Sequence, residues 1–245
     1  MGGIILDNIK VQYGKRVVLN GITLSFDKRG FIALVGGNGS GKSTLAKVIA
    51  GVVDHTGRVY DEETKKLPKV GYVWQNPEWG FIATTVWEEV VLSYLLRGFP
   101  HKKAYEEARL ILSEFGLYTF RDYPISKLSG GYRQVLATIT MLITEPDVMI
   151  FDEVTSMLDP KERYMVLGYI SHLSKKKAVI LITQISEDIK YADRVWAISN
   201  GEIVYDGDPE ELWKIDYRKF GLTLPSTYTL TSKWGVPWKP LSSIR

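Results

Sequence analysis

The chain of 245 residues contains no cysteine. This absence excludes a disulfide framework, a thiolate metal site and a cysteine nucleophile, and it permits a reducing compartment. Long apolar runs are also lacking, since Phe31–Val35 and Ala178–Ile182 fall far short of the roughly 20 residues that a membrane-spanning helix needs. The opening MGGIILDNIK has no basic segment followed by an apolar run, so we expect no secretory signal. We therefore expect any membrane association to go through a partner protein.

The chain also has little surplus charge of either sign. Its 31 lysines and arginines exceed its 28 acidic residues by three. Lys233, Lys239 and Arg245 account for this surplus, because residues 222–245 contain no acid, and residues 1–221 are neutral overall. Binding to nucleic acid requires many cations on one face of a protein. The neutral body therefore argues against nucleic acid as a partner.

What the sequence does contain is a succession of short strands and helical segments. Residues alternate between apolar and polar in Ile9–Tyr13 and Val17–Phe26, which predicts antiparallel strands joined by a turn at Gly14 and Lys15. Short apolar runs predict buried strands at Phe31–Val35, Val70–Trp74, Val148–Asp152, Val179–Thr183 and Arg194–Ile198. Helical segments such as Lys42–Gly51 lie between these strands. The pattern predicts an α/β protein with a mostly parallel sheet and an N-terminal antiparallel β layer.

Between Trp74 and Val148 the pattern is helical and contains no clear strand. The predicted helices are Val86–Arg97, Lys102–Phe115 and Gly131–Thr144. We therefore predict an α/β core from residues 1–81 and 147–220, with residues 82–146 inserted as a helical subdomain. Residues 221–245 have no periodicity, and they contain Pro225, Trp234, Pro237, Trp238 and Pro240. This last segment is predicted to be a docked or mobile tail.

A phosphate-loop pattern runs from Gly36 to Thr44, with the sequence Gly-Gly-Asn-Gly-Ser-Gly-Lys-Ser-Thr. A strand precedes it and a helix follows, an arrangement in which backbone N–H groups and a helix N-terminus surround a phosphate. Lys42 is predicted to neutralise the β and γ phosphates, and Ser43 to ligate Mg²⁺. The predicted nucleotide contacts are Gly36, Asn38, Gly39, Ser40, Gly41, Lys42, Ser43 and Thr44. The alternative, a glycine-rich turn with a solvent-facing lysine, is disfavoured by the flanking strand and helix.

Two carboxylates close the predicted buried strand Val148–Asp152. Asp152 is predicted to be the second anchor for Mg²⁺. Glu153 follows at the edge of the strand, where a carboxylate can orient the attacking water or accept its proton. Two acids after a strand are more often the start of a solvated loop, so this prediction depends on the phosphate loop upstream.

Residues 128–134 read Leu-Ser-Gly-Gly-Tyr-Arg-Gln and lie between the phosphate loop and the acidic strand. With those two motifs, this segment resembles the signature motif of ATP-binding cassette (ABC) ATPases, and the resemblance covers roughly residues 4–220. Ser129 and the N–H groups of Gly130 and Gly131 begin a helix and form a second anion site. The resemblance implies that this site meets the γ phosphate held by an opposite subunit, with ATP and Mg²⁺ as cofactors.

The resemblance assigns roles to several other residues. It implies that Tyr13 stacks on adenine, and that Gln75 senses Mg²⁺ and the attacking water and links to the transporter. Asp159 lies in a loop, Ser156–Asp159, that crosses the dimer interface in the family. Gln184 stands where the family normally has a histidine that contacts the γ phosphate. An amide can donate a hydrogen bond there, but it can neither titrate nor carry charge.

Three other residues depart from the family pattern: Tyr132, Val154 and Met157. They are compatible with tolerated variation. Gln184 is different, because it places ATP turnover at this chain's own phosphate loop in doubt. We therefore expect the chain to work with a second, different ATPase subunit.

The segment from Gln75 to Val90 resembles energy-coupling factor (ECF) ATPases, which drive uptake of vitamins or transition-metal ions. Phe220-Gly221-Leu222, followed by Pro225, resembles the same group. This implies a transmembrane coupling subunit and a substrate-binding membrane subunit as partners, with the chain at the cytoplasmic face of the cell membrane. Trp79 and Phe81 are predicted to meet the coupling helix of an importer. Trp87 is predicted instead to fill the core of the helical subdomain.

Two alternatives remain. A soluble ABC-type ATPase of DNA repair or translation generally carries a long coiled-coil insertion or two fused cassettes, and this chain has room for neither. A regulatory cassette that mainly binds nucleotide, paired with a catalytic partner, is kept open by Gln184. The transported substrate is not encoded in an ATPase subunit, so the sequence does not distinguish a vitamin from a metal ion.

Overall fold

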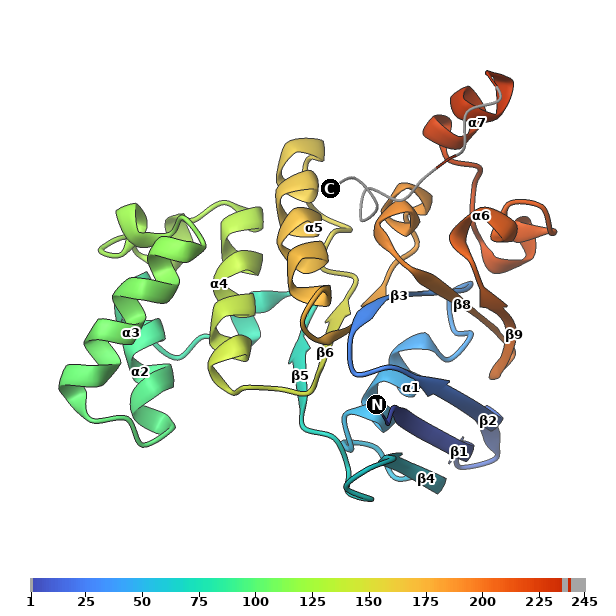
Figure 1. The fold of residues 1–245 in the computed structure, drawn as a ribbon, viewed down its shortest axis with the longest axis horizontal. Helices are drawn as coiled ribbons and strands as arrows, with labels where there is room; N and C mark the ends of the chain where they lie inside the picture. Colours follow the sequence, from blue (N-terminus) through green and yellow to red (C-terminus); the bar gives the residue numbers. More distant parts are fainter. Residues whose placement is uncertain (1, 235–237, 239–245) are drawn as a thin grey trace.

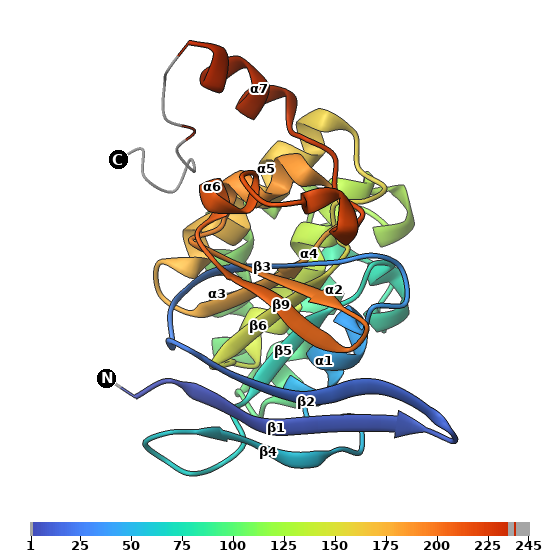
Figure 2. The same cartoon turned by 90° about the vertical axis from the view of Figure 1, so that its right-hand side faces the viewer.

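The computed structural model describes residues 2–234 and residue 238. Within the predicted tail, Pro237, Lys239, Pro240 and Arg245 lie outside the described residues. Figure 1 shows the strands in the centre and right of the molecule and a group of helices at the left, and Figure 2 looks onto the strands from the right-hand side.

The smaller sheet contains three antiparallel strands in the order β2-β1-β4. Its strands are β1 (Ile4–Tyr13), β2 (Arg16–Phe26) and β4 (Thr56–Asp61). The predicted hairpin is confirmed, with Gly14 in its turn at φ 59°. The third strand, β4, was not predicted, because Gly57 interrupts it and only Val59 and Asp61 are buried. No alternating apolar pattern therefore marks it.

The larger sheet contains six strands in the order β5-β6-β7-β3-β8-β9. They are β3 (Gly30–Val35), β5 (Val70–Val73), β6 (Val148–Asp152), β7 (Ala178–Ile182), β8 (Arg194–Ser199) and β9 (Glu202–Gly207). All neighbours are parallel except β8 and β9. The predicted mostly parallel sheet is confirmed. The unpredicted strand β9 lies at an edge and has no fully buried side chain, so its pattern is weak.

Register brings the carboxyl ends of the central strands to one level. Asp152 of β6 pairs with Ile182 of β7, and Ile182 pairs with Leu34 of β3. The segments that leave these three strands therefore start side by side. Ligands of open parallel sheets bind at such carboxyl ends.

The two faces of the large sheet bury separate hydrophobic cores. Alternation along β3 places Ile32 and Leu34 in the core shared with the small sheet and α1 (Lys42–Ile49). Phe31 and Ala33 face the opposite core, beneath α5 (Pro160–Ser174) and the helical region. The phosphate-loop helix is thus held between two sheets, as Figure 1 shows.

The helical region contains α2 (Val86–Leu96), α3 (His101–Glu114) and α4 (Gly130–Ile143), close to the predicted helices. A capping box of Thr85 and Glu88 begins α2. Trp87 packs edge-on against Tyr105 and Tyr118, with ring centroids 5.5 and 6.5 Å away. Trp87 is thus partly buried and packs against the core of this region.

The C-terminal part contains two further helices, α6 (Pro209–Leu212) and α7 (Ser226–Lys233). The helix α7 was not predicted, because none of its residues is buried and it carries no apolar periodicity. Trp238 is buried, and its ring lies 5.9 Å from Trp213 and 5.7 Å from Tyr228. The described end of the tail is therefore docked.

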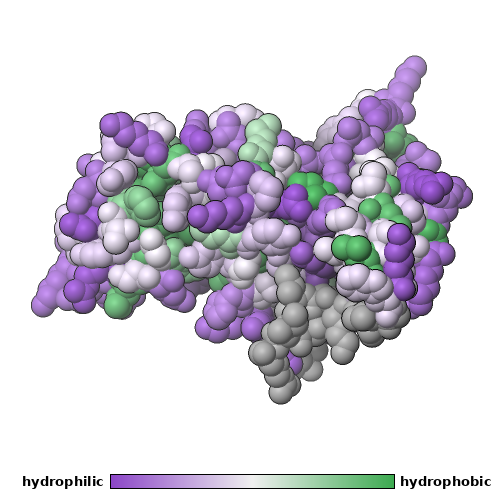
Figure 3. Space-filling model, turned by 90° about the horizontal axis from the view of Figure 1, so that it is seen from above, coloured by the Kyte–Doolittle hydropathy of each residue, from purple (hydrophilic) through white to green (hydrophobic). Residues whose placement is uncertain are grey.

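Short 3₁₀ helices connect the main elements. They are η1 (Pro77–Gly80), η2 (Tyr118–Phe120), η3 (Ile125–Lys127), η4 (Ser186–Tyr191) and η5 (Tyr217–Phe220). The face seen in Figure 3 is mostly hydrophilic, with small hydrophobic patches between the polar residues. Among the described residues, no helix has both the length and the apolar character to cross a bilayer.

Candidate nucleotide site

The phosphate loop lies between β3 and α1, where close packing requires glycine. A Cβ on Gly36 would lie 2.3 Å from the carbonyl oxygen of Ile198. Gly41 has φ 114° and caps α1, and a Cβ there would lie 2.8 Å from Leu19. The loop can therefore hold its shape only without side chains at these two positions.

Lys42 lies inside this loop and is only 6% exposed. Its Nζ donates hydrogen bonds to the carbonyl oxygens of Gly36 at 2.8 Å and Gly37 at 3.0 Å. Burial lowers the pKa of the Lys42 ammonium, and the nearby carboxylates of Glu153 and Asp152 oppose that shift. The low exposure shows that the alternative of a solvent-facing lysine is wrong. The ammonium is fixed where an anion bound by the loop would need a counter-charge.

A cavity of about 350 Å³ adjoins the loop. It is lined by Tyr13, Arg16, Val18, Asn38, Gly39, Gly41, Lys42, Ser43, Thr44 and Glu153. The Tyr13 residue is 54% exposed, so its ring is free to stack on a planar ligand at this end of the cavity. Of the remaining predicted loop residues, Ser40 is buried, and the carbonyl oxygen of Gly36 accepts the hydrogen bond from Lys42.

Arg16 was not predicted as a site residue. It is the first residue of β2, and a Cβ on Gly39 would lie 3.7 Å from its guanidinium. The hairpin turn brings this cation to the phosphate loop. No motif marks it, and only its position just after a predicted turn next to Tyr13 offered a signal.

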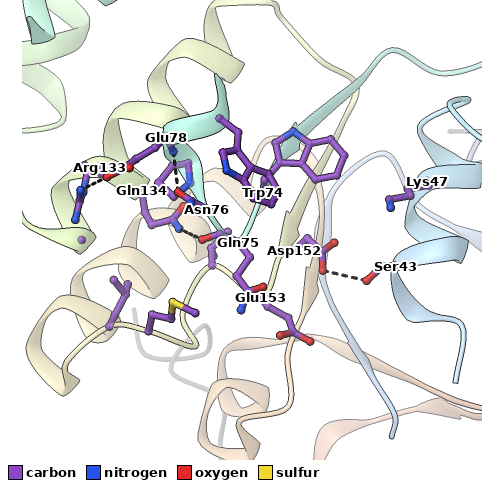
Figure 4. A pocket seen from close by; sticks show the side chains of 16 residues that line it. Ser43, Lys47, Trp74, Gln75, Asn76, Glu78, Arg133, Gln134, Asp152 and Glu153 are labelled. Atoms are coloured by element: carbon purple, nitrogen blue, oxygen red, sulfur yellow. Dashed lines mark hydrogen bonds and ion pairs between the residues drawn. The ribbon is translucent and has the colours of Figure 1, made fainter. Parts of the chain in front are cut away.

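Ser43 and Asp152 meet at the first turn of α1. The Ser43 Oγ donates to Asp152 Oδ1 at 3.4 Å (Figure 4). The Tyr72 hydroxyl donates to Asp152 Oδ2 at 2.6 Å. Burial raises the pKa of Asp152, while the hydrogen bond from Tyr72 acts in the opposite direction.

These groups fit a magnesium ion that a nucleotide holds jointly with the protein. Hard oxygen donors from one hydroxyl and one or two carboxylates, completed by phosphate oxygens, are typical of Mg²⁺ sites in nucleotide enzymes. In the part of the chain that the structure describes, no group of three or more His, Cys, Asp or Glu side chains could hold a metal unaided. The Ser43 and Asp152 pair therefore suits a cation that arrives with its nucleotide.

Glu153 and Gln184 contact each other directly. Gln184 Nε2 donates to Glu153 Oε1 at 2.7 Å. Glu153 has φ 51°, and its N–H donates to the carbonyl of Ile182 at 3.0 Å, so the β7 strand fixes its unusual backbone. The predicted general base is thus oriented by a neutral amide, which cannot take up a proton.

Gln75 lies just beyond β5 and reaches the loop that follows Glu153. Its Nε2 donates to Ser156 Oγ at 3.1 Å, and that hydroxyl donates to the carbonyl of Glu153 at 2.8 Å. Gln134, a buried residue of α4, donates to the backbone carbonyl of Gln75 at 2.9 Å (Figure 4). Gln134 was not predicted as a site residue, although it closes the signature segment.

The signature residues do not join the phosphate-loop cavity of their own chain. Ser129 is the N-cap of α4, and its Oγ accepts from the N–H of Tyr132 at 3.5 Å. Asp159 caps α5 by accepting from the N–H of Glu162 at 2.9 Å. Neither these residues nor Gly130 and Gly131 line that cavity. One chain therefore brings together the phosphate loop, Asp152, Glu153 and Gln184, and leaves the signature outside the phosphate-loop cavity.

A buried carboxylate that the sequence gave no reason to select joins the loops around the site. Asp188 is fully buried, and its Oδ2 accepts from Thr155 Oγ1 at 2.7 Å and Thr183 Oγ1 at 2.9 Å. Its Oδ1 lies 3.1 Å from Arg163 Nε. Burial raises the pKa of Asp188, and these three partners oppose the shift. The loops bearing Glu153, Asp159 and Gln184 thus share one anchor.

A larger cavity of about 720 Å³ lies between the metal end of the site and the helical region. Its wall includes Ser43, Asp152, Gln75, Gly130 and Trp79. Trp79 is 79% exposed, whereas Phe81 is partly buried against the main core. Only the first of the two aromatic residues predicted to meet a coupling helix is therefore largely free at the surface.

The sequence profile described as ABC transporter matches residues 19–156. The chain belongs to the ABC transporter family. This ABC transporter protein is 36% identical over 222 residues to the energy-coupling factor transporter ATP-binding protein EcfA1 of Mycoplasma mobile, covering 85% of this chain and 81% of that protein. It is 33% identical over 244 residues to EcfA1 of Bacillus subtilis, covering 93% and 87%. The predicted resemblance to ABC and ECF ATPases is confirmed.

Solved structures agree on the fold of this ABC transporter protein. One is cbiO1 of Clostridium perfringens, described as part of the ABC transporter complex cbiONQ, with TM-score 0.80, 24% identity and coverage of 94% of this chain and 98% of that one. Another is MJ1267 in its ADP conformation, described as an ATP-binding cassette of an ABC transporter, with TM-score 0.74, 26% identity and coverage of 87% and 94%. The predicted ABC ATPase fold is confirmed.

Proposed function

We propose that this ABC transporter protein is the ATP-binding and ATP-hydrolysing subunit of an ECF-type importer, which energises uptake of a vitamin or transition-metal ion. The observation that carries the proposal is the meeting of the phosphate loop, Asp152, Glu153 and Gln184 at the carboxyl ends of three adjacent strands. Its 36% identity to an ECF transporter ATP-binding protein supports the transport role.

In this proposal, the phosphate-loop cavity binds ATP. Tyr13 stacks on adenine, and the loop N–H groups and Lys42 hold the phosphates, with Arg16 as a second cation. Ser43, Asp152 and Gln75 would hold Mg²⁺, which would supply charge neutralisation at the transferred phosphate.

Glu153 is proposed to orient the attacking water and to accept its proton. Gln184 positions this carboxylate through its 2.7 Å hydrogen bond and donates to the γ-phosphate region. Because an amide cannot titrate, the Gln184 site supplies no cation to the transition state, and its turnover is expected to be low.

Ser129, Gly130, Gly131 and Asp159 are proposed to complete the nucleotide site of a second ATPase subunit, since they lie outside this chain's own cavity. That subunit is expected to be a different chain, which supplies the better catalytic site. Light scattering after size exclusion tests this for the chain expressed alone. A stable ATP-dependent homodimer with brisk turnover would contradict it.

The membrane partners are proposed to be a transmembrane coupling subunit and a substrate-binding subunit, with this chain on the cytoplasmic face. The 720 Å³ cavity beside Gln75 suits a coupling helix, with Trp79 as its apolar anchor. The cavity lies between the proposed α/β core (residues 1–81 and 147–220) and helical subdomain (82–146), so nucleotide-driven movement would reach the docked helix.

Co-purification with the transmembrane subunit tests this docking site. Trp79→Ala is expected to reduce recovery of that subunit about 10-fold while leaving ATP binding unchanged. Leu96→Ala is the control, because Leu96 is also well exposed, at 70%, but does not line the cavity. Equal recovery with both variants would refute the role of Trp79.

A second candidate function is a regulatory cassette that binds nucleotide while its partner performs the catalysis. The contact between Gln184 and Glu153 favours it, because it pairs the base with a neutral group. In an assembled complex, Glu153→Gln distinguishes the two: a loss of turnover supports catalysis at this site, and full turnover supports the regulatory role.

A further inference from the structure

Tyr72 touches the proposed metal ligand without belonging to any nucleotide-binding motif. It lies in β5, one strand away from Asp152, and it is half-buried. Its hydroxyl donates to Asp152 Oδ2 at 2.6 Å, a short hydrogen bond to a carboxylate. Ser43 contacts the other oxygen, Oδ1, at 3.4 Å. The two oxygens of Asp152 therefore have different partners.

The ring of Tyr72 is itself held in place. Trp74 lies two residues along the chain and packs against it, with ring centroids 4.2 Å apart. The ammonium of Lys47, from α1, lies 5.8 Å from the Trp74 ring. These contacts restrict the rotation of the Tyr72 side chain and keep its hydroxyl directed at Asp152.

A carboxylate with one oxygen fixed presents the other in one direction. Groups that hold metal ligands in this way raise metal affinity, and their loss typically costs 10- to 100-fold. Trp74, Lys47 and Asp152 all line the larger cavity. The contacts that orient Asp152 therefore lie between that cavity and the phosphate loop.

We propose that Tyr72 is a positioning residue for the magnesium ion of the nucleotide site. It fixes Asp152 Oδ2 and leaves Oδ1 beside Ser43 for the ion. The inference rests on the proposed function, because it requires that Ser43 and Asp152 hold the metal of a bound nucleotide.

The test measures Mn²⁺ binding by electron paramagnetic resonance, using the full chain with one equivalent of bound, non-hydrolysable ATP analogue. Tyr72→Phe removes only the hydroxyl and is expected to raise the dissociation constant for Mn²⁺ about 10-fold. Affinity for the analogue in EDTA is expected to stay unchanged. Trp74→Leu keeps the hydroxyl but frees the ring, and a smaller rise is expected.

Tyr169→Phe is the matched control. It also removes a donating hydroxyl, here bonded to the Phe115 carbonyl at 3.0 Å and lining neither cavity. An unchanged Mn²⁺ constant in Tyr72→Phe would overturn the inference, and so would an equal loss of analogue binding in EDTA. If the unaltered chain binds no analogue at all, the proposed function itself fails.

Discussion

The phosphate loop and the signature loop are both glycine-rich starts of helices, yet they are completed differently. The first encloses Lys42, which is 6% exposed, and its cavity is walled by residues of β1 and β2 and by Glu153. The second begins at Ser129, whose cap is a long 3.5 Å hydrogen bond, and none of its residues lines the phosphate-loop cavity of the same chain. The difference supports our proposal that one chain suffices to bind nucleotide, while the reaction requires a second surface.

The largest effect that separates binding from reaction is expected for Glu153→Gln. Turnover at this chain's own phosphate loop, measured in a complex whose partner site is inactivated, should fall about 100-fold or more, because the amide cannot accept a proton. Nucleotide affinity should change little, since the hydrogen bonds of Lys42 do not involve Glu153. Phosphate release and nucleotide titration measure the two effects. Glu211→Gln, at the surface beside Lys214, is the control, and turnover at this site that is undiminished in Glu153→Gln would show that the base is assigned wrongly.

Lys42→Ala tests the phosphate loop alone. Loss of its charged contacts is expected to weaken ATP binding by the isolated chain about 100-fold. Titration with a fluorescent ATP analogue measures this, with the exposed Lys66→Ala as control. Equal affinity in both variants would mean that the loop does not bind the phosphates.

Ser129→Ala tests the opposite side of the comparison. We expect about a 10-fold loss of turnover in the assembled complex and no change in ATP binding by the isolated chain, because Ser129 lies outside the cavity. Asp208→Ala removes a cap of the same kind from α6 and should affect neither. Weaker binding by the isolated Ser129→Ala chain would contradict the separation of the two loops.

The smallest effect is expected for Gln184→His. A histidine can carry charge near the γ phosphate, so turnover should rise about threefold, and a pH dependence should appear near pH 6.5, the ordinary pKa of histidine. Rates measured from pH 5.5 to 8.5 test this. An unchanged rate and pH profile would mean that the amide already serves in place of the histidine.

Sequence predicted the site residues that share a local motif. The register of β3, β6 and β7 brought Lys42, Asp152 and Gln184 together as the strand pattern implied. Arg16 and Tyr72 were not predicted, because only tertiary packing brings them to the site. In each case a single side chain reaches the site from a strand outside the local motifs, and nothing in its neighbouring residues marks it.

Elements of the fold were missed for a related reason. The strands β4 and β9 and the helix α7 bury few side chains or none, so hydrophobic periodicity does not mark them. A buried polar residue can be missed because its sequence neighbours suggest an exposed segment. Asp188 sits in a polar stretch typical of a surface turn, and only its contacts with Thr155, Thr183 and Arg163 show that it is an internal anchor.

The most direct test of the central claim compares ATP turnover of this chain alone with that of the chain and its co-purifying partners, with Lys42→Ala as the blank. We predict binding but little turnover by the chain alone, and turnover well above the blank in the complex. Strong turnover by the chain alone would contradict the claim that the reaction needs a different second subunit, and a homodimer active with Gln184 would take its place.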